Sequence, residues 1–262
     1  MQVRPRLSIV IPAFNEAARI CGSLEAVVRH FARSGEDVEV VVVDDGCTDA
    51  TVETVARFAA ERPPQGRVTI GVLRNGRNRG KGYSVKHGVL MARGDLVLIS
   101  DADFSTPIDD LPLLLQAVEK EGYGIAIGSR ALEDSRVEIR QAAWREMMGR
   151  GFNRLVRLLT GLPFRDTQCG FKLVLRQEVL PLFRAARIER FAYDVEILYL
   201  ARKAGVRVRE VPVRWRNAEG TKVRAWADSF DMLKDTVRIV LRDRLGRYGR
   251  LGGEPAGSAR KA

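Results

Sequence analysis

Short apolar runs, rich in β-branched residues, alternate with segments of helical periodicity along the first half of the chain. The runs cover Leu7–Ile11, Val38–Val43, Val68–Leu73 and Leu96–Ile99. Helical patterns occupy about Glu16–Phe31, Thr51–Glu61 and Ser84–Ala92. Nearly continuous apolar strands separated by helices are typical of a parallel sheet whose two faces are both covered. We therefore predict an α/β fold with a mostly parallel central sheet covered by helices.

Composition narrows the class of protein further. The chain has 262 residues, of which 45% are hydrophobic and 29% charged, which is typical of a globular protein. We expect one domain over residues 1–250 and a flexible tail over 251–262. No apolar run is long enough for a transmembrane helix, and no secretory signal is apparent at the start. The widely spaced Cys21, Cys47 and Cys169 indicate reduced thiols in a cytoplasmic protein.

The positive charge is concentrated toward the end of the chain. The formal net charge is +11, of which residues 1–201 carry +2 and residues 202–262 carry +9. A basic region of this kind can contact nucleic acid, an anionic membrane surface or phosphate-bearing substrates, or can simply be a solvated face. Charge alone does not choose among these partners.

Polar residues follow three of the predicted strands. Asn15-Glu16, Asp44-Asp45 and Asp101–Asp103 all fall where ligands bind in sheets of this type, at the carboxyl ends of the strands. The two carboxylates of Asp101-Ala102-Asp103 suit a hard divalent ion such as Mg²⁺, shared with substrate phosphates. An isolated pair of this kind could also be a solvated acidic turn. The glycine-rich loop around Lys81 is a weak phosphate-binding signal, and dinucleotide and P-loop fingerprints are absent.

These motifs carry a family resemblance. Leu7–Glu16, Val43–Asp49 and Asp101–Asp103 together resemble the inverting family 2 glycosyltransferases of the GT-A fold. Later in the chain, Gly128–Arg130, Arg165–Leu173 and Tyr193–Glu196 resemble the dolichyl-phosphate β-glucosyltransferases. The resemblance runs from about residue 7 to 245, and the polyprenyl-phosphate mannose synthases share only its first half. It implies a nucleotide-sugar-binding half over about 1–127 and an acceptor half over about 128–250.

The resemblance also implies a donor site. It assigns contact with a nucleotide sugar to residues at the strand ends and in the glycine-rich loop, namely Pro12, Ala13, Phe14, Asn15, Glu16, Val43, Asp44, Asp45, Lys81, Asp101, Ala102 and Asp103. Asp101 and Asp103 would hold Mg²⁺ or Mn²⁺, and Asp103 would be catalytic. Mannose synthases have a glutamine two positions after the second aspartate, whereas this chain has Ser105, which leaves a third protein ligand open.

The implied acceptor is a polyprenyl (dolichyl or undecaprenyl) phosphate. Arg130 matches a catalytic arginine that binds the acceptor phosphate, and Arg145, Arg216 and Lys222 are further candidates for this role. A phosphate monoester is largely dianionic at neutral pH, because its second pKa is about 6, so it needs no general base. His30 and His87, the chain's only histidines, lie in predicted helices and are expected to be structural or surface residues.

Two predicted helices combine apolar stripes with basic residues. The stripes are Trp144, Met148, Phe152, Leu155 and Leu159, and Trp226, Phe230, Leu233, Val237 and Val240. Such helices can lie in a bilayer interface or pack in a core. We favour core packing for the second, and for the first both remain open. Without a membrane span, docking on the cytoplasmic face of the membrane would depend on this surface or on a membrane-anchored partner protein.

The expected reaction is inverting transfer of glucose from UDP-glucose to the lipid phosphate, giving a β-linked polyprenyl phosphoglucose. Two alternatives within the enzyme class are mannosyl transfer from GDP-mannose and a family 2 enzyme with a soluble acceptor. A nucleic-acid-binding module would explain the basic end of the chain. It is disfavoured, and no nucleic-acid partner is expected, because the strand-end carboxylates would repel a phosphate backbone.

Overall fold

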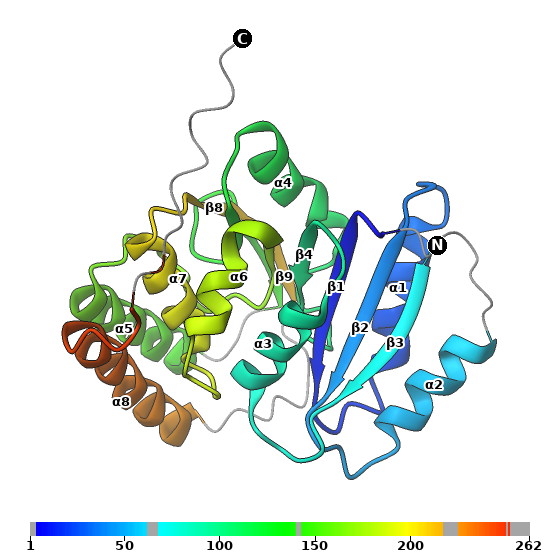
Figure 1. Ribbon diagram of the computed structural model, residues 1–262, viewed down its shortest axis with the longest axis horizontal. Coiled ribbons are helices and arrows are strands. Elements are labelled where there is room, and N and C mark those ends of the chain that lie inside the picture. The colour runs from blue at the N-terminus through cyan, green and yellow to red at the C-terminus, as the bar shows by residue number, and fades with distance from the viewer. Residues whose placement is uncertain (1–3, 62–67, 140–142, 217–224, 250, 252–262) are drawn as a thin grey trace.

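A central sheet organises the computed structural model, which describes residues 4–61, 68–139, 143–216, 225–249 and 251. Its strand order is β3-β2-β1-β4-β7-β5-β8. The strands are β1 (Leu7–Ala13), β2 (Val38–Asp44), β3 (Val68–Arg74), β4 (Leu96–Ile99), β5 (Ile125–Ser129), β7 (Lys172–Leu175) and β8 (Val208–Pro212). Only β7 runs antiparallel to its neighbours β4 and β5 within this sheet. The predicted mostly parallel sheet is confirmed (Figure 1).

Helices cover both faces of the sheet. They are α1 (Ile20–Phe31), α2 (Thr51–Glu61), α3 (Lys81–Met91), α4 (Leu111–Leu115), α5 (Ala143–Thr160), α6 (Arg176–Ala185), α7 (Tyr193–Lys203) and α8 (Ala225–Arg244). A 3-10 turn (Ile108–Asp110) precedes α4, and a π-helical turn (Gln116–Lys120) follows it. One hydrophobic core joins the sheet to α1, α2 and α4, and a second joins it to α3, α6 and α7.

The apolar runs of the sequence reflect burial on both faces. In β1, Ile9 and Ile11 face the core shared with α1, whereas Val10, between them, faces the core shared with α3. All three side chains are inaccessible to solvent. Since successive side chains of a strand point to opposite faces, a strand covered on both sides needs apolar residues at nearly every position. This requirement explains why the sequence shows no alternation of apolar and polar residues here.

Two helices begin elsewhere than the sequence predicts. The helix expected from Glu16 begins at Ile20, because Asn15 has a positive φ of 56° and residues 16–19 form a turn closed on the Glu16 carbonyl. The helix expected from Ser84 begins three residues earlier, at Lys81. Gly80, with φ of 102°, ends the preceding loop there. As a result, Glu16 lies in a turn after β1 and not in α1, and Lys81 lies at the beginning of α3.

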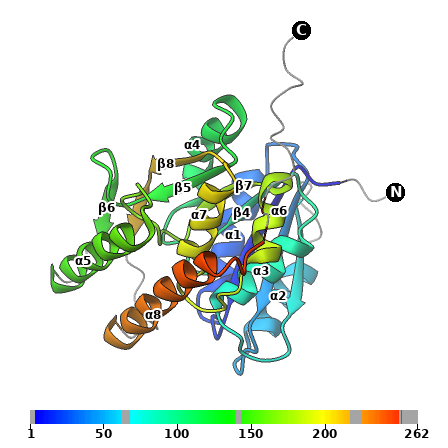
Figure 2. The same cartoon turned by 60° about the vertical axis from the view of Figure 1, so that its left-hand side comes forward.

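The two amphipathic helices α5 and α8 lie side by side at one end of the molecule (Figures 1 and 2). They bury Val156 and Ile239 respectively, neither of which belongs to the stripes read from the sequence. Within the second stripe, Phe230 and Val237 are exposed, so the expectation that this stripe is a core face is wrong. The helix turns a different face inward, which includes Asp235, Thr236 and Ile239 among the side chains that the structure describes.

A small second sheet pairs β6 (Arg136–Ile139) with β9 (Arg214–Arg216) in parallel. It is anchored to the donor half from two sides. Arg214 donates to the buried Asp110 carboxylate through its main-chain nitrogen and its guanidinium, at 2.7 and 2.8 Å. Arg216 donates its main-chain N–H to the Ser105 carbonyl at 2.8 Å. These contacts place β9 beside the loop that follows β4.

Candidate active site

The carboxyl ends of β1 and β2 are joined by a small network around Asn15. Its side-chain oxygen accepts a hydrogen bond from the Thr48 main-chain nitrogen at 2.7 Å. Its own main-chain N–H points to the sulfur of Cys47 at 3.3 Å. Asp44 closes the loop after β2 by accepting from the Cys47 N–H at 2.7 Å. The network fixes the two loops relative to each other and leaves Phe14 partly exposed at their edge.

Asp45 organises the glycine-rich loop. Its buried carboxylate accepts hydrogen bonds from the side-chain amide of Asn75 at 2.9 Å and from the main-chain N–H groups of Arg79 and Gly80 at 2.9 and 2.8 Å. A carboxylate saturated by donors on this loop holds the loop in one conformation. The loop therefore also fixes the position of Lys81, because this first residue of α3 directly follows Gly80.

Lys81 and Asp101 form an ion pair in which the lysine Nζ lies 2.5 Å from the carboxylate Oδ1. Burial would raise the pKa of Asp101, but the Lys81 ammonium, with smaller contributions from Lys172 and Arg130, holds that pKa below its usual value. Desolvation lowers the pKa of Lys81, but the attraction of Asp101, Asp194 and Asp103 together outweighs it, so this pKa is raised in turn. Both groups are therefore charged at neutral pH.

Asp103 has one occupied and one more open carboxylate oxygen. Oδ1 accepts from the Ser105 main-chain nitrogen at 3.0 Å and from the Ser105 hydroxyl at 2.9 Å. Oδ2 lies 3.7 Å from Nη1 of Arg19. The other terminal nitrogen of this guanidinium, Nη2, pairs with Glu16. Ser105 thus orients the Asp103 carboxylate.

The donor set suits a hard divalent cation. Asp101 and Asp103 follow β4 and offer oxygen atoms only, which Mg²⁺ and Mn²⁺ prefer. Within the part of the chain that the structure describes, no cluster of three or more metal-binding side chains occurs. A cation held here would take its remaining ligands from substrate phosphates and water, as Mg²⁺ commonly does. The residues present therefore fit such an ion.

Three further predicted donor residues make contacts within the protein itself. The Ala13 carbonyl accepts from the Asp45 main-chain nitrogen at 2.9 Å, and the Ala102 carbonyl accepts from the hydroxyl of Ser23 at 2.6 Å. The side chain of Val43 is buried against α3, so any contact with a ligand would come from its main chain. Pro12 is half-buried in β1.

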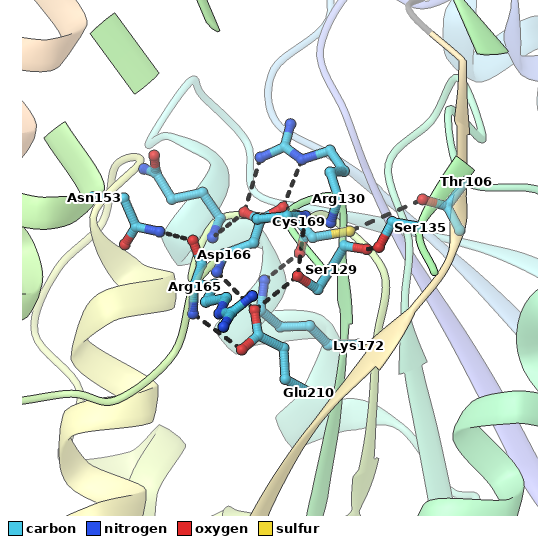
Figure 3. Close-up of polar contacts among 12 residues, drawn as sticks. Thr106, Ser129, Arg130, Ser135, Asn153, Arg165, Asp166, Cys169, Lys172 and Glu210 are labelled. Atoms are coloured by element: carbon cyan, nitrogen blue, oxygen red, sulfur yellow. Dashed lines mark hydrogen bonds and ion pairs between the residues drawn. The ribbon is translucent and has the colours of Figure 1, made fainter. Parts of the chain in front are cut away.

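On the acceptor side, Arg130 is held by a bidentate pair with the buried Asp166 (Figure 3). Its Nε and Nη2 lie 2.6 and 2.9 Å from the two carboxylate oxygens. Burial opposes ionisation of both groups, but their mutual attraction lowers the pKa of Asp166 and raises that of Arg130. The pair fixes the guanidinium plane and uses two of its donor nitrogens, so Nη1 is the nitrogen left outside this pair.

Glu210 supports this arrangement from β8 (Figure 3). It accepts from the hydroxyl of Ser129 at 2.7 Å and from the main-chain nitrogens of Arg165 and Asp166 at 3.0 and 2.7 Å. The ring of Trp215 in β9 lies 5.4 Å from the Arg130 guanidinium carbon, within cation–π range. Trp215 also lines a small pocket together with Ser100, Asp101, Ser105, Thr106, Gly170 and Phe171.

The structure says less about the other predicted acceptor residues, Arg145, Arg216 and Lys222. Arg216 ends β9 with an exposed side chain, and its main chain contacts Ser105 as described above. Arg145 belongs to α5, but its side chain lies outside what the structure describes. Lys222 and residues 252–262 of the tail expected over 251–262 also fall outside the described residues.

Neither histidine is placed as a general base at Asp101 or Asp103. His30 contacts Asp109 at 3.0 Å, and His87 contacts the side-chain oxygen of Asn75 at 2.8 Å. Burial, with a smaller effect of Arg79, lowers the pKa of His87, so this ring is neutral at pH 7. His30 and His87 thus contact Asp109 and Asn75, which are outside the predicted donor and acceptor residues.

Sequence reasoning missed several residues at this site. Arg19 lies in the turn before α1, and Trp215 and Glu210 lie in β9 and β8, all at positions with no motif of their own. By contrast, Asp166 and Lys172 lie within the Arg165–Leu173 string that carries the resemblance to the glucosyltransferases. That string marked the region as important, but it did not reveal that Asp166 and Lys172 form ion pairs with residues far away in sequence.

Comparison with known families agrees with the fold and the motifs. The sequence model of the family described as Glycosyl transferase family 2 matches residues 8–180. The chain belongs to glycosyltransferase family 2. It is therefore an enzyme that transfers a sugar.

Individual relatives are similar along nearly the whole chain. The dolichyl-phosphate β-glucosyltransferase of Dictyostelium discoideum is 36% identical over 92% of this chain and 75% of its own length. The enzyme of the same name from Saccharomyces cerevisiae is 34% identical over 92% and 76%. The one from Homo sapiens is 31% identical over 93% and 77%. The resemblance to this group, predicted from the motifs, is confirmed.

Solved structures confirm the fold. Mannosyl-3-phosphoglycerate synthase from Rubrobacter xylanophilus superposes with a TM-score of 0.66 at 21% identity, covering 96% of this chain and 78% of that one. Glucosyl-3-phosphoglycerate synthase from Mycobacterium tuberculosis, in a complex with Mn²⁺, UDP-glucose and phosphoglyceric acid, gives 0.63 at 18%, covering 94% and 80%. At these identities the likeness establishes the GT-A architecture.

Proposed function

We propose that this family 2 enzyme transfers glucose from UDP-glucose to a dolichyl or undecaprenyl phosphate and inverts the anomeric centre. The observation that carries the proposal is the placing of Asp101 and Asp103 at the end of β4, with the fixed Arg130 guanidinium close enough to lower the Asp101 pKa. Relatives named for this reaction, at 31–36% identity along nearly the full chain, support the choice of substrates.

The donor would bind across the carboxyl ends of β1, β2 and β4. Phe14 and the loop fixed by Asn15 and Asp45 would contact the base and ribose, as the family resemblance implies. Lys81 would lie near the diphosphate, because it begins α3 and already sits against Asp101. A helix N-terminus with a lysine favours anionic groups.

Asp101 and Asp103 would hold Mg²⁺ or Mn²⁺ beside the diphosphate. Such an ion would neutralise charge that develops on the leaving diphosphate. A relative of the same architecture binds Mn²⁺ together with UDP-glucose, which supports this part of the proposal. Ser105 keeps the Asp103 carboxylate oriented, and Lys81 keeps Asp101 ionised.

The acceptor phosphate would be held by Arg130. With Nε and Nη2 bound to Asp166, the nitrogen left outside that pair, Nη1, would bind one phosphate oxygen and direct another toward C1 of the sugar. Arg145, Arg216 and Lys222 are further candidates for contact with the phosphate. The phosphate is itself the nucleophile, so the reaction is a single in-line displacement in which the C1–oxygen bond to UDP breaks.

The lipid acceptor implies that the enzyme works at a membrane surface. Among the described residues, no helix is long and apolar enough to cross a bilayer. Large apolar side chains are instead exposed on α5 and at or just beyond α8, namely Leu155, Leu158, Leu159, Phe230, Val237, Leu241 and Leu245. Exposed basic residues accompany them, namely Arg154, Arg157, Lys234, Arg238 and Arg244. We propose that this surface docks peripherally on the anionic cytoplasmic face of a membrane.

Arg130→Ala tests the division between donor and acceptor. The variant should lose transfer to a polyprenyl phosphate while binding UDP with Mn²⁺ as the wild type does. Isothermal titration calorimetry and a lipid-extraction assay measure the two quantities separately. Equal impairment of nucleotide binding and transfer would remove Arg130 from the acceptor site. Transfer to 3-phosphoglycerate in preference to the lipid would replace the lipid acceptor with a soluble one.

A further inference from the structure

A buried ion pair next to the candidate donor site has no part in the proposal above. Lys172, the first residue of β7, lies with its Nζ 2.5 Å from Oδ1 of Asp194, in the first turn of α7. Each side chain is only 4% exposed. Removing two charges from water offsets much or all of their attraction, so an apolar pair of similar volume would serve the fold at least as well. The pair therefore points to a task other than packing.

Lys172 controls the turn on which Asp101 rests. Its ammonium donates a second bond to the Cys169 carbonyl, as Figure 3 shows, and so fixes the peptide between Cys169 and Gly170. A Cβ atom on Gly170 would lie 2.1 Å from Oδ2 of Asp101, so the carboxylate packs directly against this glycine. In the sheet, Lys172 is the register partner of Ile99, two residues before Asp101. The ammonium thus reaches the Asp101 environment from a rigid strand.

Charged groups of both signs surround Asp101. Lys81 and Lys172 are the nearby ammonium groups, and burial raises the pKa of Asp194 against the attraction of Lys172 and Lys81. Lys172 adds to the effect of Lys81 in opposing the burial of the Asp101 carboxylate. Lys81 in turn acts on both aspartates. Without Asp194, Lys172 would be an uncompensated buried charge, so the two residues can serve Asp101 only as a pair.

We propose that Lys172 and Asp194 are positioning residues that hold the Asp101 carboxylate in the geometry required for binding the metal and the nucleotide diphosphate. They touch neither substrate. They act through the Cys169–Gly170 turn, against which the Asp101 carboxylate packs. The inference rests on the proposed donor site at Asp101 and deepens it.

The decisive variant replaces the whole pair, K172M/D194L. Two apolar side chains of similar size restore packing without leaving a buried charge, so the variant should stay folded, with a melting temperature only modestly below the wild type because the Cys169 carbonyl loses its donor. Binding of UDP in the presence of Mn²⁺, measured by calorimetry, should nevertheless weaken by about 10- to 100-fold, the loss typical of residues that orient metal ligands. K203M is the matched control, because Lys203 pairs with Asp243 from the same helix as Asp194 but is partly exposed.

A second, conservative variant tests the same inference if K172M/D194L does not fold. K172R keeps the charge opposite Asp194 but places a planar guanidinium where a compact ammonium donates to Cys169. It should stay folded and bind UDP with Mn²⁺ about tenfold more weakly. K203M should bind like the wild type.

Unchanged UDP affinity in folded K172M/D194L, or in folded K172R where the double variant does not fold, would overturn this inference and leave the donor site intact. A wild-type chain that binds no UDP with Mn²⁺, or an Asp101→Ala variant that binds it normally, would overturn the inference together with the proposed donor site. Weakened binding in K203M equal to that in K172M/D194L would overturn the inference as well, because the loss would then not be specific to Asp101.

Discussion

The Arg130–Asp166 pair gives the sharpest test of how the acceptor half is built. Asp166 accepts from the Arg130 main chain, from two Arg130 side-chain nitrogens and from the Gln168 main chain, at 2.6–3.2 Å. Asp166→Asn keeps the shape of the side chain but removes its charge and one acceptor oxygen. Arg130 would then remain largely enclosed without a carboxylate partner.

The expected cost follows from burial. Removing one partner of a buried ion pair typically lowers the free energy of unfolding by about 3–5 kcal/mol. The low end, about 3 kcal/mol, applies here because a third of the Arg130 side chain is exposed. At about 2–4 °C per kcal/mol for a domain of this size, the melting temperature should fall by about 6–12 °C. Asp95→Asn, in the exposed pair with Arg4, should cost at most about 1 kcal/mol.

The effect also has a defined dependence on pH. Since Arg130 lowers the pKa of Asp166 against the opposing effect of burial, the stabilisation is complete above the pKa of an unfolded aspartate, about 3.9. It is lost as the pH falls below that value toward the folded pKa. Denaturant unfolding should therefore separate wild type and Asp166→Asn equally at pH 5 and 7, and less below about pH 4. The reasoning is refuted if Asp166→Asn is no less stable than Asp95→Asn at pH 7.

Four further outcomes are expected. Asp103→Ala should abolish transfer without changing the melting temperature, and residual metal-dependent transfer would remove Asp103 from the site. Gly46→Ala should weaken UDP binding in calorimetry, since the new Cβ would lie 2.6 Å from the Arg77 main chain at a φ of 75°, and unchanged affinity would argue against the donor loop. Leu158→Glu should reduce sedimentation with anionic vesicles but not transfer to a short-chain, water-soluble acceptor, and equal sedimentation would displace the docking surface from α5. His87→Gln should leave the pH profile of transfer unchanged between pH 7 and 8, because the lowered pKa leaves the His87 ring neutral there; a shifted profile would give the histidine a role in the reaction.

The sheet and the donor residues could be predicted because the signals are local. A strand buried on both faces must be apolar at nearly every position, so the runs ending before Pro12, Asp44 and Ser100 marked three adjacent strands. Polar groups after those strands then had to meet at one edge. The beginning of α3 was missed by three residues, because the positive φ of Gly80 depends on the contacts of the loop with Asp45.

The acceptor half could not be assembled in the same way. Asp166 meets Arg130 across 36 residues and Lys172 meets Asp194 across the intervening helix α6, and no periodicity encodes such pairings. The prediction of which face of α8 is buried was also wrong. Its apolar stripe has helical spacing, but Thr236 and Ile239 turned out to be buried while Phe230 stayed exposed. Which face a helix buries depends on its neighbours, and α8 packs beside α5, far away in sequence.

The most direct test of the central claim is a transfer assay with the purified chain and Mn²⁺ or Mg²⁺. Undecaprenyl or dolichyl phosphate would be offered with labelled UDP-glucose or with labelled GDP-mannose. The account predicts label in the lipid phase from UDP-glucose, its loss on addition of a chelator, and a β-linked product. Label from GDP-mannose alone, or bound UDP-glucose without any lipid product, would contradict it.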